Sequence, residues 1–170
     1  ASNFFPADRA PTVNVWQAAI TGNTPAIEQH VSAGTDLNAK EDFGGSTPLM
    51  VAAIFGQWEV AAILIDNGAN LEARNKTGGT ALHVACFFCR PAIVKLLLNA
   101  GAEADQTNNR GLTSLEVVTI EFDAKSEGVY RHTYDSIGLT FDSQHVQQNR
   151  SRIAGILRSH ANGEDRASAD

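Results

Sequence analysis

Apolar residues occur along this chain in short clusters that return with a fixed period. The segment Thr47-Pro48-Leu49-Met50 recurs as Thr80-Ala81-Leu82-His83 and again as Thr113-Ser114-Leu115-Glu116, at a spacing of 33 residues each time. A repeat of this length is typical of a solenoid, in which each unit buries its apolar face against its neighbours. The pattern therefore predicts a stack of similar units that share one continuous core.

Inside each unit the apolar positions follow helical spacing. Residues 60, 63 and 64 are apolar in one unit and residues 94, 97 and 98 in the next, so each set forms one stripe of a helix. Gly34, Gly68 and Gly101 each follow such a run, at the place where glycine commonly ends a helix. Thr47 precedes Pro48, which is the order expected at the N-cap and first position of a helix. Each unit is therefore predicted to be a hairpin of two helices.

The chain resembles the ankyrin-repeat family, whose units of about 33 residues carry a Thr-Pro-Leu-His motif. The likeness extends through Ala52-Ala53, the turn at Gly56, and the run Val94-Lys95-Leu96-Leu97-Leu98 followed by Gly101-Ala102. The resemblance implies an all-α ankyrin-repeat solenoid that binds a partner through its concave face and through the loops, or fingers, between repeats. We expect one domain over residues 1–170, with repeats at about 13–45, 46–78, 79–111 and 112–162.

The first and last repeats depart from this pattern. Trp16-Gln17-Ala18-Ala19 replaces the motif in the first repeat, as expected of an end unit. In the fourth repeat, Arg152–Leu157 lies 59 rather than 33 positions beyond Ile93–Leu98, which predicts an insertion over about residues 121–148. We expect a lengthened first helix there, a turn near Gly138 and a helix capped by Asp142. The finger at residues 41–46 is predicted to be one residue longer than its counterparts.

A partner site is predicted from the two positions that precede each turn after the first helix of a repeat. These positions are mostly apolar, and contiguous exposed apolar side chains on a rigid scaffold are characteristic of interaction patches. The alternative is that the same side chains are buried against the next repeat or beneath the insertion. The candidate partner-binding residues are Ile54, Phe55, Trp58, Phe87 and Phe88 on the concave side and Phe43, Arg74, Lys76 and Arg110 on the fingers.

The net charge of −6 argues against a nucleic-acid partner, because phosphate binding needs clustered lysine and arginine. The apolar runs are far shorter than the roughly 20 residues of a membrane span. We therefore expect a protein or peptide partner, no nucleic acid, no membrane insertion and a monomer. The segments Phe87–Pro91 and Gly128–Tyr130 are similar to a bacterial group of ankyrin proteins of unknown role. The compartment stays open between cytoplasm and periplasm or secretion.

Two groups of residues suggest chemistry only weakly. Cys86 and Cys89 have redox or metal spacing, with His83 nearby, but no second ligand pair follows and all three occupy repeat positions. His132 and His145, with acidic neighbours in the insertion, are candidates for an acid–base group, but no nucleophile motif, phosphate loop or ligand pair accompanies them. We expect no catalysis and no cofactor. The alternatives are an enzyme or accessory domain with a small-molecule pocket near the insertion, and a structural spacer in a longer polypeptide.

Overall fold

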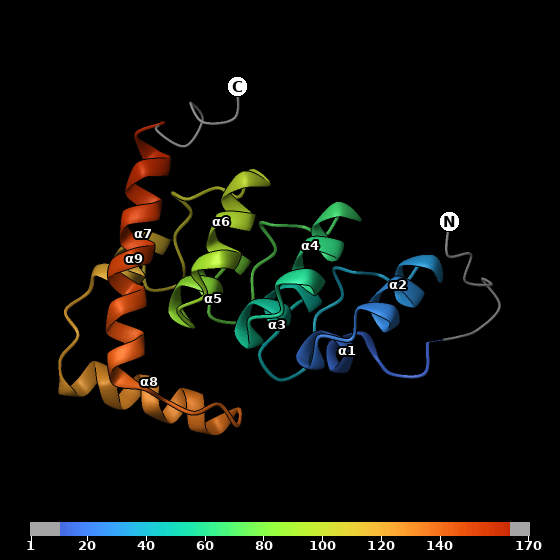
Figure 1. Ribbon diagram of the computed structural model, residues 1–170, viewed down its shortest axis with the longest axis horizontal. Coiled ribbons are helices and arrows are strands. Elements are labelled where there is room, and N and C mark those ends of the chain that lie inside the picture. The colour runs from blue at the N-terminus through green and yellow to red at the C-terminus, as the bar shows by residue number, and fades with distance from the viewer. Residues whose placement is uncertain (1–10, 164–170) are drawn as a thin grey trace.

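The computed structural model describes residues 11–163, and within that range it contains nine α-helices and one isolated β-bridge, between Thr107 and Thr113. Figure 1 shows how the helices are arranged. The predicted all-α solenoid of helical hairpins is confirmed. Residues 1–10 and 164–170 of the expected domain lie outside the described residues. The helices are α1 (Val15–Thr21), α2 (Thr24–Ser32), α3 (Pro48–Phe55), α4 (Trp58–Asp66), α5 (Ala81–Phe87), α6 (Pro91–Asn99), α7 (Ser114–Thr119), α8 (Ala124–Ser136) and α9 (Ser143–Ala161).

Eight of these helices form two rows. Helices α1, α3, α5 and α7 make the inner row, in which each helix contacts the next, and α2, α4, α6 and α9 make the outer row in the same way. Leu49 and Leu82 of the inner row are fully buried, as are Leu64 and Leu97 of the outer row. The shared seam of aliphatic side chains holds the stack rigid, because an isolated hairpin has no partner for its apolar face. No helix within residues 11–163 has the length and apolar character needed to cross a membrane.

Local signals in the sequence account for the ends of the inner helices. The Thr47 hydroxyl accepts a hydrogen bond from the Met50 backbone N–H, which confirms its predicted role as an N-cap. The chain leaves α1 and α3 through glycines with positive φ, whereas Cys89 takes that conformation after α5, at φ +56°. Cysteine is uncommon in this region of backbone space. The buried thiol packs beneath α9, with its Sγ 3.7 Å from the Val146 carbonyl oxygen.

The insertion differs from expectation at its start and agrees with it at its end. The predicted lengthening of the first helix is wrong, because α7 ends at Thr119 and Ile120 has extended ψ of 139°. The guanidinium of Arg150 donates to the Val117 and Ile120 carbonyls at this end of the helix. The predicted turn at Gly138 is confirmed by its φ of +73°, and Asp142 caps α9 as predicted.

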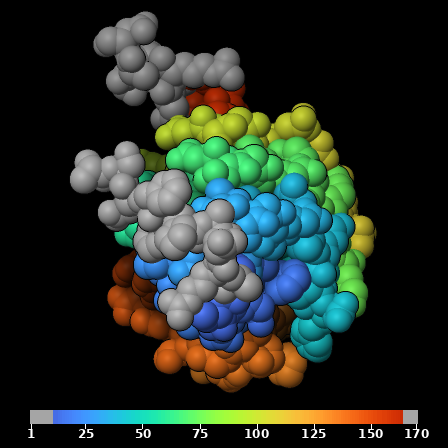
Figure 2. Space-filling model, turned by 90° about the vertical axis from the view of Figure 1, so that its right-hand side faces the viewer, coloured from blue at the N-terminus to red at the C-terminus, as the bar shows by residue number. Residues whose placement is uncertain are grey.

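Helix α8 is the part of the insertion that has no counterpart in the other repeats. It projects beyond the stack, as seen at the lower left of Figure 1 and at the bottom of Figure 2, which looks along the repeats from the first one. Aromatic side chains attach it to α5: Tyr130 stacks on Phe87, with ring centroids 4.4 Å apart. The Tyr134 hydroxyl donates to the Phe88 carbonyl at 3.1 Å. The inserted helix is therefore fixed against the inner row.

Candidate functional site

A groove of about 840 Å³ lies where the inner helices, the fingers and α8 meet. We define finger 1 as residues 40–46, finger 2 as residues 74–79 and finger 3 as residues 107–112. The groove is bounded by fingers 2 and 3, by α5 and α7, and by the side of α8 that faces them. The insertion thus supplies one wall of a concavity that the regular repeats would leave open.

The walls of the groove are mainly apolar. Phe87 is half-buried and stacks on Tyr130, so one edge of this aromatic pair faces the groove. Val129 on α8 is 54% exposed and Ile120 is 40% exposed, although both are large apolar residues. Exposed apolar side chains gathered around a concavity are typical of a binding site rather than of an ordinary solvated face.

Arg150 lies at the bottom of the groove and is only 5% exposed. Besides the two carbonyls at the end of α7, its guanidinium donates to the Tyr130 hydroxyl at 2.7 Å and lies over the Phe122 ring. The ion pair found among the described residues joins Arg131 to Glu127, so no carboxylate pairs with Arg150 there. The carbonyl oxygens at the end of α7, where the helix dipole is negative, therefore stabilise this buried charge.

Two other polar groups of the groove are held in their neutral forms. Burial raises the pKa of Tyr130 to about 12, against the opposing effect of the Arg150 charge, so its hydroxyl stays protonated. Burial likewise lowers the pKa of His83. The His83 Nδ1 accepts from the Thr80 N–H and its Nε2 donates to the Leu112 carbonyl at 3.0 Å. His83 thus joins α5 to finger 3, while Tyr130 holds α8 against α5.

Each finger is closed by one side chain that accepts several backbone N–H groups. Asn75 accepts from residues 77 and 79, and Asn108 accepts from residues 110 and 112. In finger 1 the carboxylate of Glu41 accepts from residues 43, 44 and 46. The backbone bond that closes finger 1 runs from Glu41 N to Ser46 O, whereas the matching bonds run from Asn75 N to Gly79 O and from Asn108 N to Leu112 O. Finger 1 is therefore one residue longer, as predicted, and the longer glutamate side chain matches this length. Burial opposes ionisation, but the backbone donors outweigh it and lower the pKa of Glu41.

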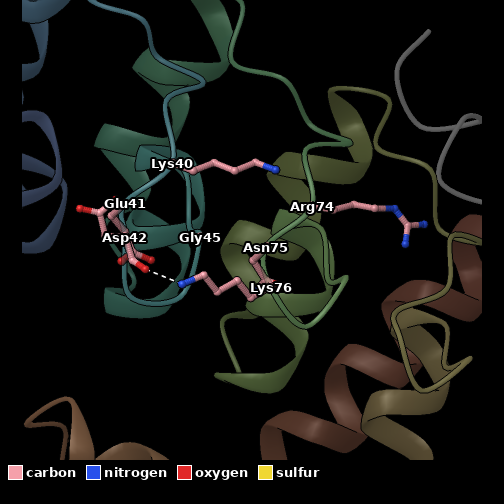
Figure 3. Close-up of a pocket in the computed structure, with 7 residues that line it drawn as sticks. All are labelled: Lys40, Glu41, Asp42, Gly45, Arg74, Asn75 and Lys76. Carbon is pink, nitrogen blue, oxygen red and sulfur yellow. Dashed lines mark hydrogen bonds between the residues drawn. The ribbon is translucent and has the colours of Figure 1, made fainter.

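The basic residues of finger 2 connect the fingers to one another. Figure 3 shows Lys76 reaching back to finger 1, where its ammonium donates to the Asp42 and Phe43 carbonyls. Arg74 extends in the other direction and donates to the Thr107 carbonyl at 2.8 Å and to Gln106. Both side chains are exposed, yet much of their hydrogen-bonding capacity is used inside the molecule.

The structure brings only part of the predicted patch together. Phe87 and Arg110 line the groove, whereas Phe43 is 94% exposed at the tip of finger 1. Phe88 also lines the groove but is only 8% exposed, because it packs against Tyr134 with ring centroids 5.4 Å apart, so little of its surface is open to a partner. The alternative of burial beneath the insertion describes Phe88. Ile54 and Phe55 are half-buried against the core, and Trp58 is 44% exposed on the first turn of α4.

Several residues of the groove were not predicted from the sequence, and Val129, Tyr130 and Arg150 are the most prominent of them. The first two lie in the insertion, where no repeat exists to define a register. Arg150 carried a signal, because Val146, Ile153 and Leu157 place it on the buried stripe of α9. A charged residue on an apolar stripe indicates a buried polar contact.

The candidate chemical groups lie apart from the groove or are packed in the core. Burial raises the pKa of the Cys86 thiol and raises that of Cys89 to about 11, so neither is an activated nucleophile. His132 and His145 are exposed and do not line the groove. Within residues 11–163 no three metal-ligating side chains gather into a group.

The stacked hairpins and their open inner face define a helical repeat protein. A family model described as ankyrin repeats (3 copies) matches residues 15–108, and the chain belongs to the ankyrin-repeat family. It is a protein-interaction module. The predicted likeness to a bacterial group stays a prediction.

Curated relatives share short stretches of this chain. It is 44% identical over 61 residues to protein phosphatase 1 regulatory subunit 12A of Mus musculus, covering 36% of this chain and 6% of the relative. It is 31% identical over 67 residues to ankyrin repeat-containing protein P1E11.10 of Schizosaccharomyces pombe, covering 39% and 32%. Dauer abnormal formation protein 25 of Caenorhabditis elegans is 38% identical over 61 residues, covering 36% and 16%. The chain thus spans a third or less of the length of these relatives.

Proposed function

We propose that the chain binds a protein or peptide partner on its inner face, with the groove between finger 3, the inner helices and α8 as the main contact. The observation that carries this proposal is the exposure of Ile120 and Val129 around a groove of about 840 Å³. Burying such side chains against a partner removes apolar surface from water, which is the dominant favourable term in association. The rigid stack limits the entropy lost on binding.

The rim of the groove supports a polypeptide rather than a polyanion. Arg110, Lys125, Glu121 and Asp123 all line the groove, so charges of both signs accompany its apolar side chains. A polar rim around an apolar core is the usual anatomy of a protein interface. We further propose that the chain acts as a monomer without nucleic acid, consistent with its net charge of −6.

The fingers and the outer positions extend this proposal. Phe43 projects from a finger that Glu41 holds in one conformation, so it suits an anchor for a large partner. Arg74 and Lys76 contribute by keeping the fingers in register, and Arg110 contributes a charge at the groove. Ile54, Phe55 and Trp58 are the candidates for a broader contact along the inner row and its turns.

The experiment is affinity capture from a lysate of the native organism, quantified by mass spectrometry, with two matched variants. Val129→Glu places a charge in the groove, and His132→Glu places one on an exposed part of the same helix outside it. We expect a partner that is retained by the native chain and by His132→Glu but reduced at least about ten-fold by Val129→Glu. Thermal unfolding of all three checks that the fold is unchanged. Equal capture by both variants would contradict a groove-based function.

A small-molecule pocket is the second candidate, because the groove lies beside the insertion as that alternative requires. Its volume falls within the roughly 300–1,000 Å³ of typical ligand sites. His132 and His145 lie outside the groove and so add no imidazole to it. This candidate is therefore proposed as a binding pocket and not as a catalytic one. A fragment screen by NMR, read out at the Val129 and Val117 methyl groups, tests it. Fragment contacts confined to surfaces outside the groove would dismiss this candidate.

A further inference from the structure

The fingers are joined by a hydrogen-bonded ladder that repeats every 33 residues. The backbone N–H of Lys76 donates to the Gly44 carbonyl at 2.9 Å, and the backbone N–H of Asn109 donates to the Thr77 carbonyl at 3.0 Å. Each finger therefore offers one carbonyl to the finger that follows it. The next position in this series is the carbonyl of Arg110.

The same residues form a second rung through their side chains. The Lys76 ammonium donates to the Phe43 carbonyl at 3.0 Å, and the Asn109 side-chain amide donates to the Lys76 carbonyl at 3.1 Å. One residue of each following finger thus supplies two donors, its backbone N–H and its side-chain nitrogen. The next acceptor of this second series is the carbonyl of Asn109.

These last two acceptors are open. Within residues 11–163 no donor reaches the carbonyl of Asn109 or that of Arg110, although both residues lie on the exposed finger 3. Carbonyl groups retain a strong tendency to pair, and an exposed row of unpaired backbone groups is a template for another chain. Among residues 11–163, finger 3 is therefore the last finger of the ladder and keeps two unpaired acceptors.

The opposite edge of the ladder is closed. The position that matches Lys76 and Asn109 in finger 1 is Phe43, and its backbone N–H donates to the Glu41 carboxylate at 2.5 Å. The Phe43 N–H, which would pair with an earlier finger, is thus already hydrogen-bonded within finger 1. The ladder can add a chain at finger 3 and not at finger 1.

The open edge borders the candidate site. Asn109 and Arg110 line the same groove as Phe87, Ile120 and Val129. A chain that pairs with the two carbonyls has apolar surface beside it, so backbone pairing and side-chain burial act at one place. This combination is characteristic of recognition of an extended peptide, in which main-chain bonds provide affinity and a pocket provides specificity.

We propose that the groove binds an extended segment of a partner protein in which one asparagine or lysine continues the ladder. Its backbone N–H donates to the Arg110 carbonyl and its side-chain nitrogen donates to the Asn109 carbonyl, as Lys76 and Asn109 do within the molecule. A large apolar residue of the same segment packs between Phe87 and Val129. This inference rests on the proposed function and specifies the chemistry of its partner.

The test begins with a phage-displayed library of random linear nonapeptides selected on the native chain and counter-selected on Val129→Glu. We expect the enriched sequences to pair an asparagine or lysine with a nearby large apolar residue. One enriched peptide is then synthesised with its backbone amides N-methylated one at a time. Methylation at the asparagine or lysine should raise the Kd about ten-fold or more, because it removes one donor and blocks close approach, while methylation at outward-facing amides should change it little.

Carbonyl ¹³C chemical shifts of the isotope-labelled protein locate the pairing directly. Binding should move the Asn109 and Arg110 signals and leave the already bonded Lys76 and Thr77 carbonyls unchanged. Peptides that bind the groove without moving these two signals, and that tolerate every N-methylation, would overturn the ladder proposal and leave the proposed function intact. A library that yields no groove-directed peptide would count against both. Movement of the two signals with protein concentration alone would assign the edge to a second copy and overturn the proposal.

Discussion

Arg150 determines several features of the insertion through a single side chain. It binds the carbonyls that end α7, the hydroxyl of Tyr130 on α8, and the face of the Phe122 ring. Its charge is buried among neutral acceptors. Removing some of these acceptors would leave a buried charge without partners, which lowers the free energy of unfolding. The side chain therefore couples the end of one helix to the position of another.

Replacing Arg150 by methionine should lower the free energy of unfolding by about 3 kcal/mol, because the α7 carbonyls and the Tyr130 hydroxyl lose a charged donor. Urea unfolding measures this change. Arg152→Met is the matched control, since Arg152 is exposed on the same helix, and it should stay within about 0.5 kcal/mol of the native chain. Equal effects of the two substitutions would show that Arg150 is not a structural anchor.

His83 should make the stability depend on pH. Its folded pKa lies below the ordinary value of 6.5, because burial disfavours the charged ring. Above pH 6.5 the ring is neutral in both states, whereas below it the unfolded chain binds a proton that the folded chain does not. Stability should therefore fall as the pH drops from 6.5 toward the folded pKa. His83→Gln should be less stable by about 1–2 kcal/mol at pH 7 but have a flatter profile below 6.5. A native slope that persists in His83→Gln, measured by urea unfolding, would contradict this role.

At the scale of the element, α8 depends on aromatic contacts with α5 rather than on a shared aliphatic seam. Phe88 packs against Tyr134, and the Phe88 carbonyl accepts from the hydroxyl of the same tyrosine. Phe88→Ala should cost about 3–4 kcal/mol in the free energy of unfolding, as expected for a buried phenylalanine. The matched change Phe43→Ala, at an exposed fingertip, should cost less than about 0.5 kcal/mol. Similar losses in denaturant unfolding would mean that Phe88 is not a core residue.

The helices of the regular repeats could be predicted from the sequence, whereas the structure of the insertion could be predicted only in part. Thr47 and the glycines at the turns are local signals with one structural solution, so the caps and hairpins were predictable. The end of α7 was not, because it depends on Arg150, which lies 30 residues farther along the chain than Ile120. Asp123 caps α8 by accepting from the Ser126 N–H. This cap is a local signal, but it was not predicted because it lies in the insertion, outside the repeat pattern.

The candidate site was harder to predict than the fold for the same reason. Phe87 and Phe88 are neighbours in a motif that repeats, and the sequence treats them alike. Both line the groove, and only the position of α8 separates them, since it leaves Phe87 half-buried and covers nearly all of Phe88. Lys76 and Arg74 were predicted to bind a partner, but their contacts join fingers that are about 33 residues apart in the sequence.

At the scale of the whole molecule, the glutamate that closes finger 1 has a consequence for assembly. A solenoid whose two ends were complementary would be able to join head to tail, and repeated joining without closure produces filaments. Glu41 accepts the Phe43 N–H that such a junction would use, so within residues 11–163 finger 1 has no free backbone donor at the position that matches Lys76 and Asn109. One carboxylate thereby gives the ladder a direction and disfavours head-to-tail joining of two copies through it.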